Sequence, residues 1–550
     1  MVWNDQAWPY ECAVPSEVAS EFRNGLGSER QRSSVCRWSH VPPRRERERD
    51  RRSEQKAWHV DKRNSCRFPS SLLRKPIVAI MTALTIPSST ASSLVSRLTN
   101  LFAMPSFDTP EKLRPTAYLD GLRGFAAFLV YWHHHELWAH GLMRDAIFEQ
   151  GYGFDGQHYF SALPFVRNFF GGGHYAVATF FVISGYVLSV KPMRLIHAGE
   201  QEKLADNLAS ALFRRWLRLF MPLIATTFLF MTSWHAFGIW VDSAKPQSNY
   251  RDEFWWWYAE VKNFSFIYHL GGEPWLSYNF HLWSIPVEFK GSMVVYTSLL
   301  AFSRCTKKAR LWCQVALIFY FVYIVDGTHY ALFSAGMLLN DLDLLAVKHE
   351  LPSFLVQLEP FSKHIFYSLF VVSFYLGGVP VHTKDINDLA KTPGWYLLSF
   401  LKPQAVFDYK WFYLFWAGVL LVVSVPRIPW LKRFFETRFC QYLGRISFAL
   451  YLVHGPILWT IGDRIYTAVG WGREPQLTML ANWVNKFPLP MAGPFGLEMA
   501  FLLPHIVLLP LTLYVAEIST RLFDEPSVTF PNWLYKKVLG GGQPSSTRLP

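Results

Sequence analysis

The chain has 550 residues, of which 51% are hydrophobic and 17% aromatic, whereas only 17% are charged. Soluble domains carry about 25% charged residues, so this composition argues against an ordinary soluble protein and favours a membrane protein. The formal net charge of +13 does not indicate a nucleic-acid partner, because much of it lies between Arg44 and Lys75. Six cysteines without paired or CxxC spacing argue against a disulfide framework or a zinc site.

Residues 1–100 are polar and basic, and we predict that they form a disordered N-terminal region. The run 44–52 mixes both signs of charge and lacks apolar periodicity, which is typical of a solvated tail. A basic patch that binds a membrane surface, or one of the nuclear type, is the alternative. The apolar stretch 77–86 is too short to span a bilayer, and no usable signal peptide is apparent.

Ten apolar stretches are long enough to cross a hydrocarbon core of about 30 Å. They predict an all-α integral membrane protein, a bundle of about ten transmembrane helices. Its transmembrane domain covers residues 115–526, and a cytosolic C-terminal tail covers 527–550. The predicted spans lie near residues 120–140, 174–192, 213–234, 281–302, 311–326, 329–347, 361–379, 411–425, 446–463 and 496–518.

Lysine and arginine concentrate in alternate loops, as the positive-inside rule requires. They follow the second, fourth, eighth and tenth spans, so we predict a multi-pass protein of the ER, Golgi or plasma membrane with both termini cytosolic. The opposite segments, 235–280, 380–410 and 464–495, are aromatic and poor in basic residues. Asn263 begins the sequon Asn263-Phe264-Ser265, and a glycan there would confirm the side. The alternative is a chance sequon that stays unmodified because it lies close to the membrane.

The first span carries Arg123 and His134, which are eleven residues apart and therefore share a helix face about 16 Å apart. This places Arg123 at the cytosolic mouth and His134 near the middle of the bilayer. A neutral histidine is a suitable general base for a hydroxyl, whereas an interhelical hydrogen bond is the structural alternative. A metal site that uses the cluster 133–135 with Glu136 is disfavoured, because adjacent helical residues diverge by about 100°.

The second and third spans contain features that favour a donor-binding site. A glycine triplet, 171–173, precedes the second span, and Ser184 lies in its FFVISGY segment, where small residues permit close approach. Arg214, Arg215 and Arg218 lie at the cytosolic end of the third span and could hold phosphates. Positive-inside anchoring explains these arginines equally well.

Two further polar residues lie inside predicted spans at depths comparable to that of His134. Glu288 lies about 12 Å from the far side, and His454 lies at a similar depth from the cytosolic side. All three could converge on one cavity, where a carboxylate would orient the histidine ring and favour its charged form. The alternative for Glu288 is a structural ion pair with Lys290 or with another helix.

Taken together, these motifs resemble the acyltransferase-3 family of multispanning membrane O-acyltransferases. Four segments occur in the family's order between residues 118 and 526: Arg-x10-His, FFVISGY, LWSIPVEF and ISFALYLVHGP. The form of the Glu288 motif, followed by Lys290-Gly291-Ser292, and the ending Asp524-Glu525-Pro526 look like the fungal branch. The arginine motif has one more residue before its proline than the common pattern, which leaves open which arginine meets the donor.

The resemblance implies transfer of an acyl group, above all acetyl, from acyl-CoA to a hydroxyl of a carbohydrate, lipid or secondary metabolite. His134 is then the catalytic base and Arg123 helps to hold the donor, while Glu288 orients or supports the base. The predicted partners are the lipid bilayer, acyl-CoA and the hydroxyl-bearing acceptor, with no tightly bound cofactor and no metal. Donor binding is assigned to Arg123, Arg214, Arg215, Arg218 and Ser184, and supporting roles to Asp120, Tyr451 and His454.

Two other functions are compatible with these residues. A proton-coupled transporter could use His134, Glu288 and His454 as a proton relay. Inverted repeats and paired broken helices would favour it, and the sequence shows neither. A scaffold or receptor without chemistry would tolerate replacement of His134.

Overall fold

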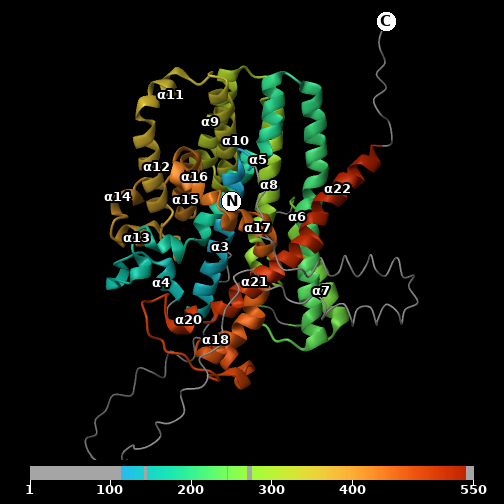
Figure 1. The fold of residues 1–550 in the computed structure, drawn as a ribbon, viewed down its shortest axis with the longest axis vertical. Coiled ribbons are helices and arrows are strands. Elements are labelled where there is room, and N and C mark those ends of the chain that lie inside the picture. Colours follow the sequence, from blue (N-terminus) through green and yellow to red (C-terminus); the bar gives the residue numbers. More distant parts are fainter. Residues whose placement is uncertain (1–112, 142–144, 244–245, 269–274, 540–550) are drawn as a thin grey trace, which may run out of the picture. The chain divides into compact units, whose positions relative to one another are not determined.

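The computed structural model describes residues 113–141, 145–243, 246–268 and 275–539 (Figure 1). All regular secondary structure within these ranges is helical, which confirms the all-α prediction. The region predicted to be disordered, 1–100, lies outside the described residues. Five described helices are long and apolar enough to cross a membrane: Gly173–Ala198, Gln201–Phe237, Thr328–Val347, Tyr409–Arg427 and Met499–Val538.

A helix occupies each of the ten stretches that we predicted as spans, although a count of ten membrane crossings stays a prediction. These helices are α3 (Ala117–His140), α5 (Gly173–Ala198), α6 (Gln201–Phe237), α8 (Ser284–Ala301), α9 (Lys307–Phe319), α10 (Thr328–Val347), α12 (Ser362–Leu376), α15 (Tyr409–Ser424), α17 (Arg438–Ile457) and α21 (His505–Ser519).

Shorter helices fill the connections between them. The segments predicted to lie opposite the cytosol contain α7, α13, α14, α18 and α19. In Figure 1, α7 and α18 lie toward the lower end, α13 and α14 lie near mid-height, and α11 lies at the upper end. Residues 525–538, at the start of the predicted C-terminal tail, are helical. The bounds are α4 (Asp145–Glu149), α7 (Tyr250–Ser265), α11 (Ser353–Gln357), α13 (Ile386–Lys391), α14 (Tyr396–Ser399), α16 (Pro429–Phe435), α18 (Asp463–Val469), α19 (Glu474–Met479), α20 (Met499–Leu502) and α22 (Glu525–Val538).

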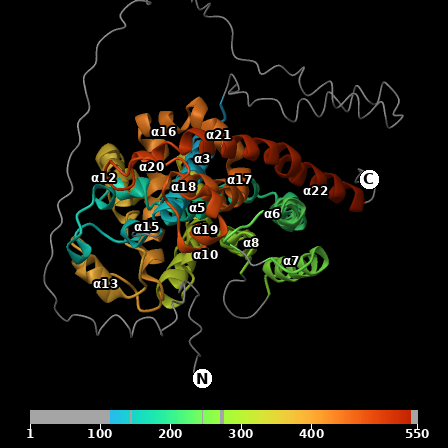
Figure 2. The ribbon, with the colours of Figure 1, turned by 90° about the horizontal axis from the view of Figure 1, so that it is seen from below.

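Helix α5 packs against α3, α6, α8, α10 and α15. Figure 2 shows α3, α5 and α17 lying between α12 and α13 on one side and α6, α7 and α22 on the other. Small residues bring α5 and α10 into backbone contact. A Cβ atom added to Gly185 would lie 2.0 Å from the Phe333 carbonyl oxygen, and one added to Gly336 would lie 2.1 Å from that of Val182. The small residues of the FFVISGY segment therefore serve helix packing.

Helices α3 and α17 make a second close contact, which fixes the position of the polar residues beyond it. A Cβ atom added to Gly124 would lie 2.2 Å from the Gly444 nitrogen, and one added to Gly444 would lie 2.4 Å from the Asp120 carbonyl oxygen. His134 and His454 each follow their glycine by ten residues, about 15 Å along the helix. Because these two histidines also meet, α3 and α17 run in the same direction.

Candidate active site

Two histidines from α3 and α17 form the centre of the candidate site. Nδ1 of His134 lies 3.0 Å from Nε2 of His454, and Nδ1 of His454 lies 3.2 Å from the Leu450 carbonyl oxygen. A carbonyl oxygen only accepts, so Nδ1 of His454 carries a proton. In neutral His454 the other nitrogen, Nε2, must then accept from Nδ1 of His134. This chain of two bonds leaves Nε2 of His134 with a free lone pair.

A third histidine, His281, stacks on this pair. Its ring centroid lies 3.7 Å from that of His134 and 4.9 Å from that of His454. Gly455 provides the space, since a Cβ atom there would lie 2.9 Å from Nδ1 of His281. That Nδ1 is buried and has no hydrogen-bond partner among the described residues. The sequence analysis did not single out His281, although a histidine at the start of a predicted span was a usable signal.

The three histidines form a group that could hold a metal ion, because their ligand nitrogens lie within 4.8 Å of one another. Imidazole binds a metal through a lone pair in the plane of its ring. The three rings lie within 17° of parallel. Stacked parallel rings cannot direct their lone pairs at one tetrahedral ion, so metal binding would require His281 to turn out of the stack.

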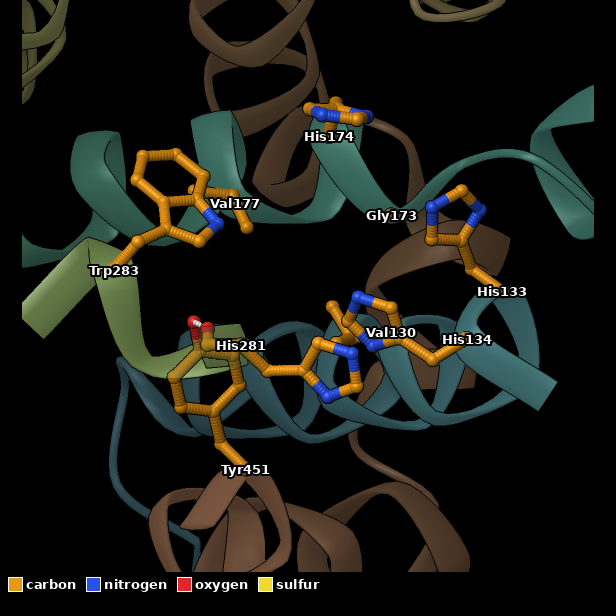
Figure 3. A pocket seen from close by; sticks show the side chains of 9 residues that line it. All are labelled: Val130, His133, His134, Gly173, His174, Val177, His281, Trp283 and Tyr451. Carbon is orange, nitrogen blue, oxygen red and sulfur yellow. Dashed lines mark hydrogen bonds between the residues drawn. The ribbon is translucent and has the colours of Figure 1, made fainter. Parts of the chain in front are cut away.

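A cavity of about 30 Å³ lies beside His134, with room for a group the size of one or two water molecules (Figure 3). His174 of α5 and His133 of α3 line it, and Trp283 closes another side. Val130 and Val177 belong to separate clusters of buried apolar residues, so the cavity lies where these two clusters meet. The remaining lining residues are Gly173, His281 and Tyr451.

The neighbours of His134 on α3 point in different directions, as the helix geometry predicted. His133 packs on Gly173, where a Cβ atom would lie 2.4 Å from its ring. His135 bonds through Nδ1 to the Tyr466 hydroxyl at 2.8 Å, and Glu136 lies beside His140, 3.4 Å away. The histidine that completes the site therefore comes from another helix, and neither His135 nor Glu136 lines the cavity.

Glu288 is absent from the residues that line this cavity. Its carboxylate accepts hydrogen bonds from Ser184, at 2.6 Å, and from the Arg215 guanidinium, which also donates to Ser292 at 2.7 Å. The ion pair with another helix, one of our two readings of Glu288, is the arrangement that the structure contains. The convergence of Glu288 with His134 and His454 on one cavity was wrong. The arginine of α6 holds the carboxylate, and it is His454 that hydrogen-bonds to Nδ1 of His134.

Arg123 and Arg218, two of the arginines proposed for the donor, each contact a carboxylate and a backbone carbonyl. Arg123 donates to the Gly444 carbonyl at 3.0 Å and lies 3.7 Å from Asp120. Arg218 pairs with Asp524 and donates to Ser527 of α22. Each guanidinium therefore already has protein partners, and a phosphate would compete with them.

The other predicted residues have separate surroundings. The Tyr451 hydroxyl donates to the His281 carbonyl and lies 2.8 Å from the Ser284 hydroxyl, so Tyr451 supports the segment that carries His281. Arg214 bonds to Asn532 of α22. Asn263 is exposed on α7, where its glycosylation stays a prediction.

Membrane-length apolar helices and a histidine-lined cavity place this chain among all-α membrane proteins with a polar site in the interior. The sequence profile of the acyltransferase domain matches residues 116–509. The chain therefore belongs to the acyltransferase-3 family, as the motifs indicated, and it is an acyltransferase.

Curated fungal proteins are similar over most of this region. O-acetyltransferase PaAT-1 of Phomopsis amygdali is 30% identical over 481 residues, which cover 79% of this chain and 88% of the relative. Acyltransferase clz18 of Cochliobolus lunatus is 23% identical, covering 66% of this chain and 80% of the relative. Acyltransferase R4 of a Phoma species is 24% identical, covering 54% of this chain and 70% of the relative. No solved structure matches the chain.

The Arg215–Glu288 pair generates a test of its structural role. Replacing Arg215 by Met leaves a largely buried carboxylate without its countercharge, and this should lower stability by about 3 kcal/mol. The double variant Arg215→Met/Glu288→Leu should recover much of that loss, because it removes the unpaired charge. Thermal unfolding of the purified variants measures both effects. The single variant Glu288→Leu completes the comparison. If the stability losses of Arg215→Met and Glu288→Leu add up in the double variant, the pairing is contradicted.

Proposed function

We propose that this protein is an O-acyltransferase that moves an acetyl group from acetyl-CoA to a hydroxyl of a small organic molecule. The chain of hydrogen bonds from the Leu450 carbonyl through His454 to His134 carries the proposal. It presents an unprotonated Nε2 of His134 beside a cavity, which is what a general base for a hydroxyl requires. The name of the relative PaAT-1, an O-acetyltransferase, supports the same reaction.

The reaction follows from that geometry. Nε2 of His134 takes the proton of the acceptor hydroxyl while its oxygen attacks the thioester carbonyl carbon. The tetrahedral intermediate collapses, the carbon–sulfur bond breaks, and the departing thiolate takes the proton from His134. The products are the ester and free CoA. His454 holds the His134 ring during both transfers and stabilises the charged ring by accepting from Nδ1.

The donor would approach from the end of the bundle where Arg123 lies. Arg123 and His134 are about 16 Å apart along α3, a span that an extended pantetheine arm can bridge. The phosphates would bind near Arg123 and Arg218, in exchange for part of their contacts with Asp120 and Asp524. Arg215 is less suitable than Arg123 and Arg218 as a ligand for the donor phosphates, because its guanidinium already donates to Glu288 and Ser292.

The size of the cavity favours a short acyl chain. A volume of about 30 Å³ beside His134 accepts a methyl group, whereas a longer chain would collide with Val130 and Val177. The acceptor is a carbohydrate, a lipid or a secondary metabolite. The names of the fungal relatives do not select among these classes.

Replacing His134 by Ala should abolish acceptor-dependent release of free thiol from acetyl-CoA. Loss of a general base typically costs about 10²- to 10⁴-fold in rate. The assay uses the purified protein with a pool of hydroxyl acceptors, and His364→Ala, which removes an exposed histidine from α12, is the matched control. Equal activity of the wild type and His134→Ala would disprove the assignment of the base.

Substitutions of His454 should separate orientation from substrate binding. His454→Ala removes the acceptor for Nδ1 of His134, so kcat should fall while the KM for acetyl-CoA stays nearly constant. His454→Gln keeps a carbonyl oxygen that can accept this hydrogen bond and should recover part of the loss. Steady-state kinetics of the wild type and the two variants provide the measurement. A kcat of His454→Ala equal to that of the wild type would argue against the orienting role.

Enlarging the cavity should widen the range of acyl groups. The wild type should favour acetyl-CoA over butyryl-CoA by at least about tenfold in kcat/KM, since two extra methylenes must be accommodated. Val177→Ala should narrow this ratio by removing two methyl groups from the cavity wall. Val187→Ala, which alters an exposed residue of the same helix, is the control. An unchanged ratio in Val177→Ala would place the acyl group elsewhere.

A further inference from the structure

A second cavity, of about 140 Å³, lies apart from the histidine site and shares no lining residue with it. Its walls come from the connection between α4 and α5, the end of α12 and the segment between α13 and α14. Tyr375 and Trp395 form one wall, where their rings stack at a centroid distance of 5.3 Å. The Tyr375 hydroxyl donates to the Gly394 carbonyl at 2.9 Å, which holds that wall in place.

A buried arginine lines the same cavity. Arg167 is only 4% exposed, and one of its terminal nitrogens, Nη1, has no hydrogen-bond partner among the described residues. Its Nη2 donates to the Phe148 carbonyl at a long 3.3 Å. No carboxylate oxygen lies within ion-pair distance of Arg167 in the described ranges, and the nearby Glu149 is close to His382 instead, at 3.7 Å.

An arginine in these surroundings is costly unless an anion compensates its charge. Burial lowers the pKa of Arg167 to about 10, so the guanidinium nevertheless stays charged at neutral pH. The unpartnered Nη1, together with a charge that nearby Glu149 offsets without a direct ion pair, favours a negatively charged oxygen at this position. The aromatic wall beside them requires an apolar, flat or short-branched group.

We propose that this cavity binds a small organic anion, a carboxylate attached to a ring or a short branched chain. The carboxylate bonds to Arg167, and the apolar part lies against Tyr375 and Trp395. The volume of the cavity is sufficient for such a ligand, because an apolar protein cavity of about 150 Å³ is known to take up benzene. Exposed Phe165 and Phe169 pack on Phe374 beside the cavity and form an aromatic rim through which an amphiphilic acid can enter.

Radiolabelled benzoate is a suitable probe, since it combines one carboxylate with one ring. Equilibrium dialysis against the full-length protein in detergent should show saturable binding. Unlabelled benzoate should compete, whereas benzyl alcohol, which has the same ring without the charge, should not. Arg167→Gln should weaken binding by about ten- to a hundredfold, the usual effect of losing a hydrogen bond to a charged group. Arg251→Gln removes a charge from an exposed site on α7 and should have no effect.

A second variant protects this test against misfolding of Arg167→Gln. Ala162→Leu fills the cavity without touching the charge, and it should also abolish binding. Elution volume and thermal midpoint without benzoate report whether each variant is folded. No saturable binding by the wild type up to about 10 mM, equal binding by folded Arg167→Gln, or equal competition by benzyl alcohol would overturn the proposal. None of these readouts depends on acyl transfer, so the proposal can fail independently of the proposed function.

Discussion

The close parallel contact between α3 and α17 is the constraint on which the site depends. Gly124 and Gly444 let the two backbones touch at one end, and ten residues further along each helix His134 and His454 reach hydrogen-bonding distance. A larger residue at either glycine would force the helices apart, and a separation of about 1 Å would break a bond of 3.0 Å. Packing of small residues thus sets the geometry of the histidine pair.

The proposed base and the ion pairs of the nearby arginines have different surroundings. The three rings of the histidine centre are joined by a hydrogen bond and by stacking, whereas Arg123, Arg215 and Arg218 each pair with a carboxylate. A carboxylate beside His134 would stabilise its charged form, but it would itself have to be desolvated. A histidine hydrogen-bonded to the proposed base, in place of a carboxylate, avoids that cost, which gives a physical reason for the separation of Glu288 from His134.

Several glycines and small residues in the recognisable motifs have packing roles that their sequence context did not reveal. Gly173 makes room for the His133 ring, Gly455 makes room for His281, and Gly185 allows α5 to touch α10. Ser184 donates to Glu288 and so belongs to the ion pair between α6 and α8. Motifs that resemble ligand-binding segments can therefore be required for helix contacts, because a bundle with many close crossings needs residues without side chains.

The sequence by itself determined the helical class, the positions of the ten apolar helices and the family, and it singled out His134 and His454, which meet in the structure. These features follow from hydrophobic runs and from polar residues placed where lipid makes them costly. The tertiary structure decided which polar residues meet. It paired Glu288 with Arg215, brought His281 onto the histidine pair and enclosed Arg167 beside an aromatic cavity. The depth of a residue along a helix can be read from the sequence. Which neighbouring helix its side chain faces depends on the crossing angles of the helices, and contacts between distant segments of the chain determine those angles.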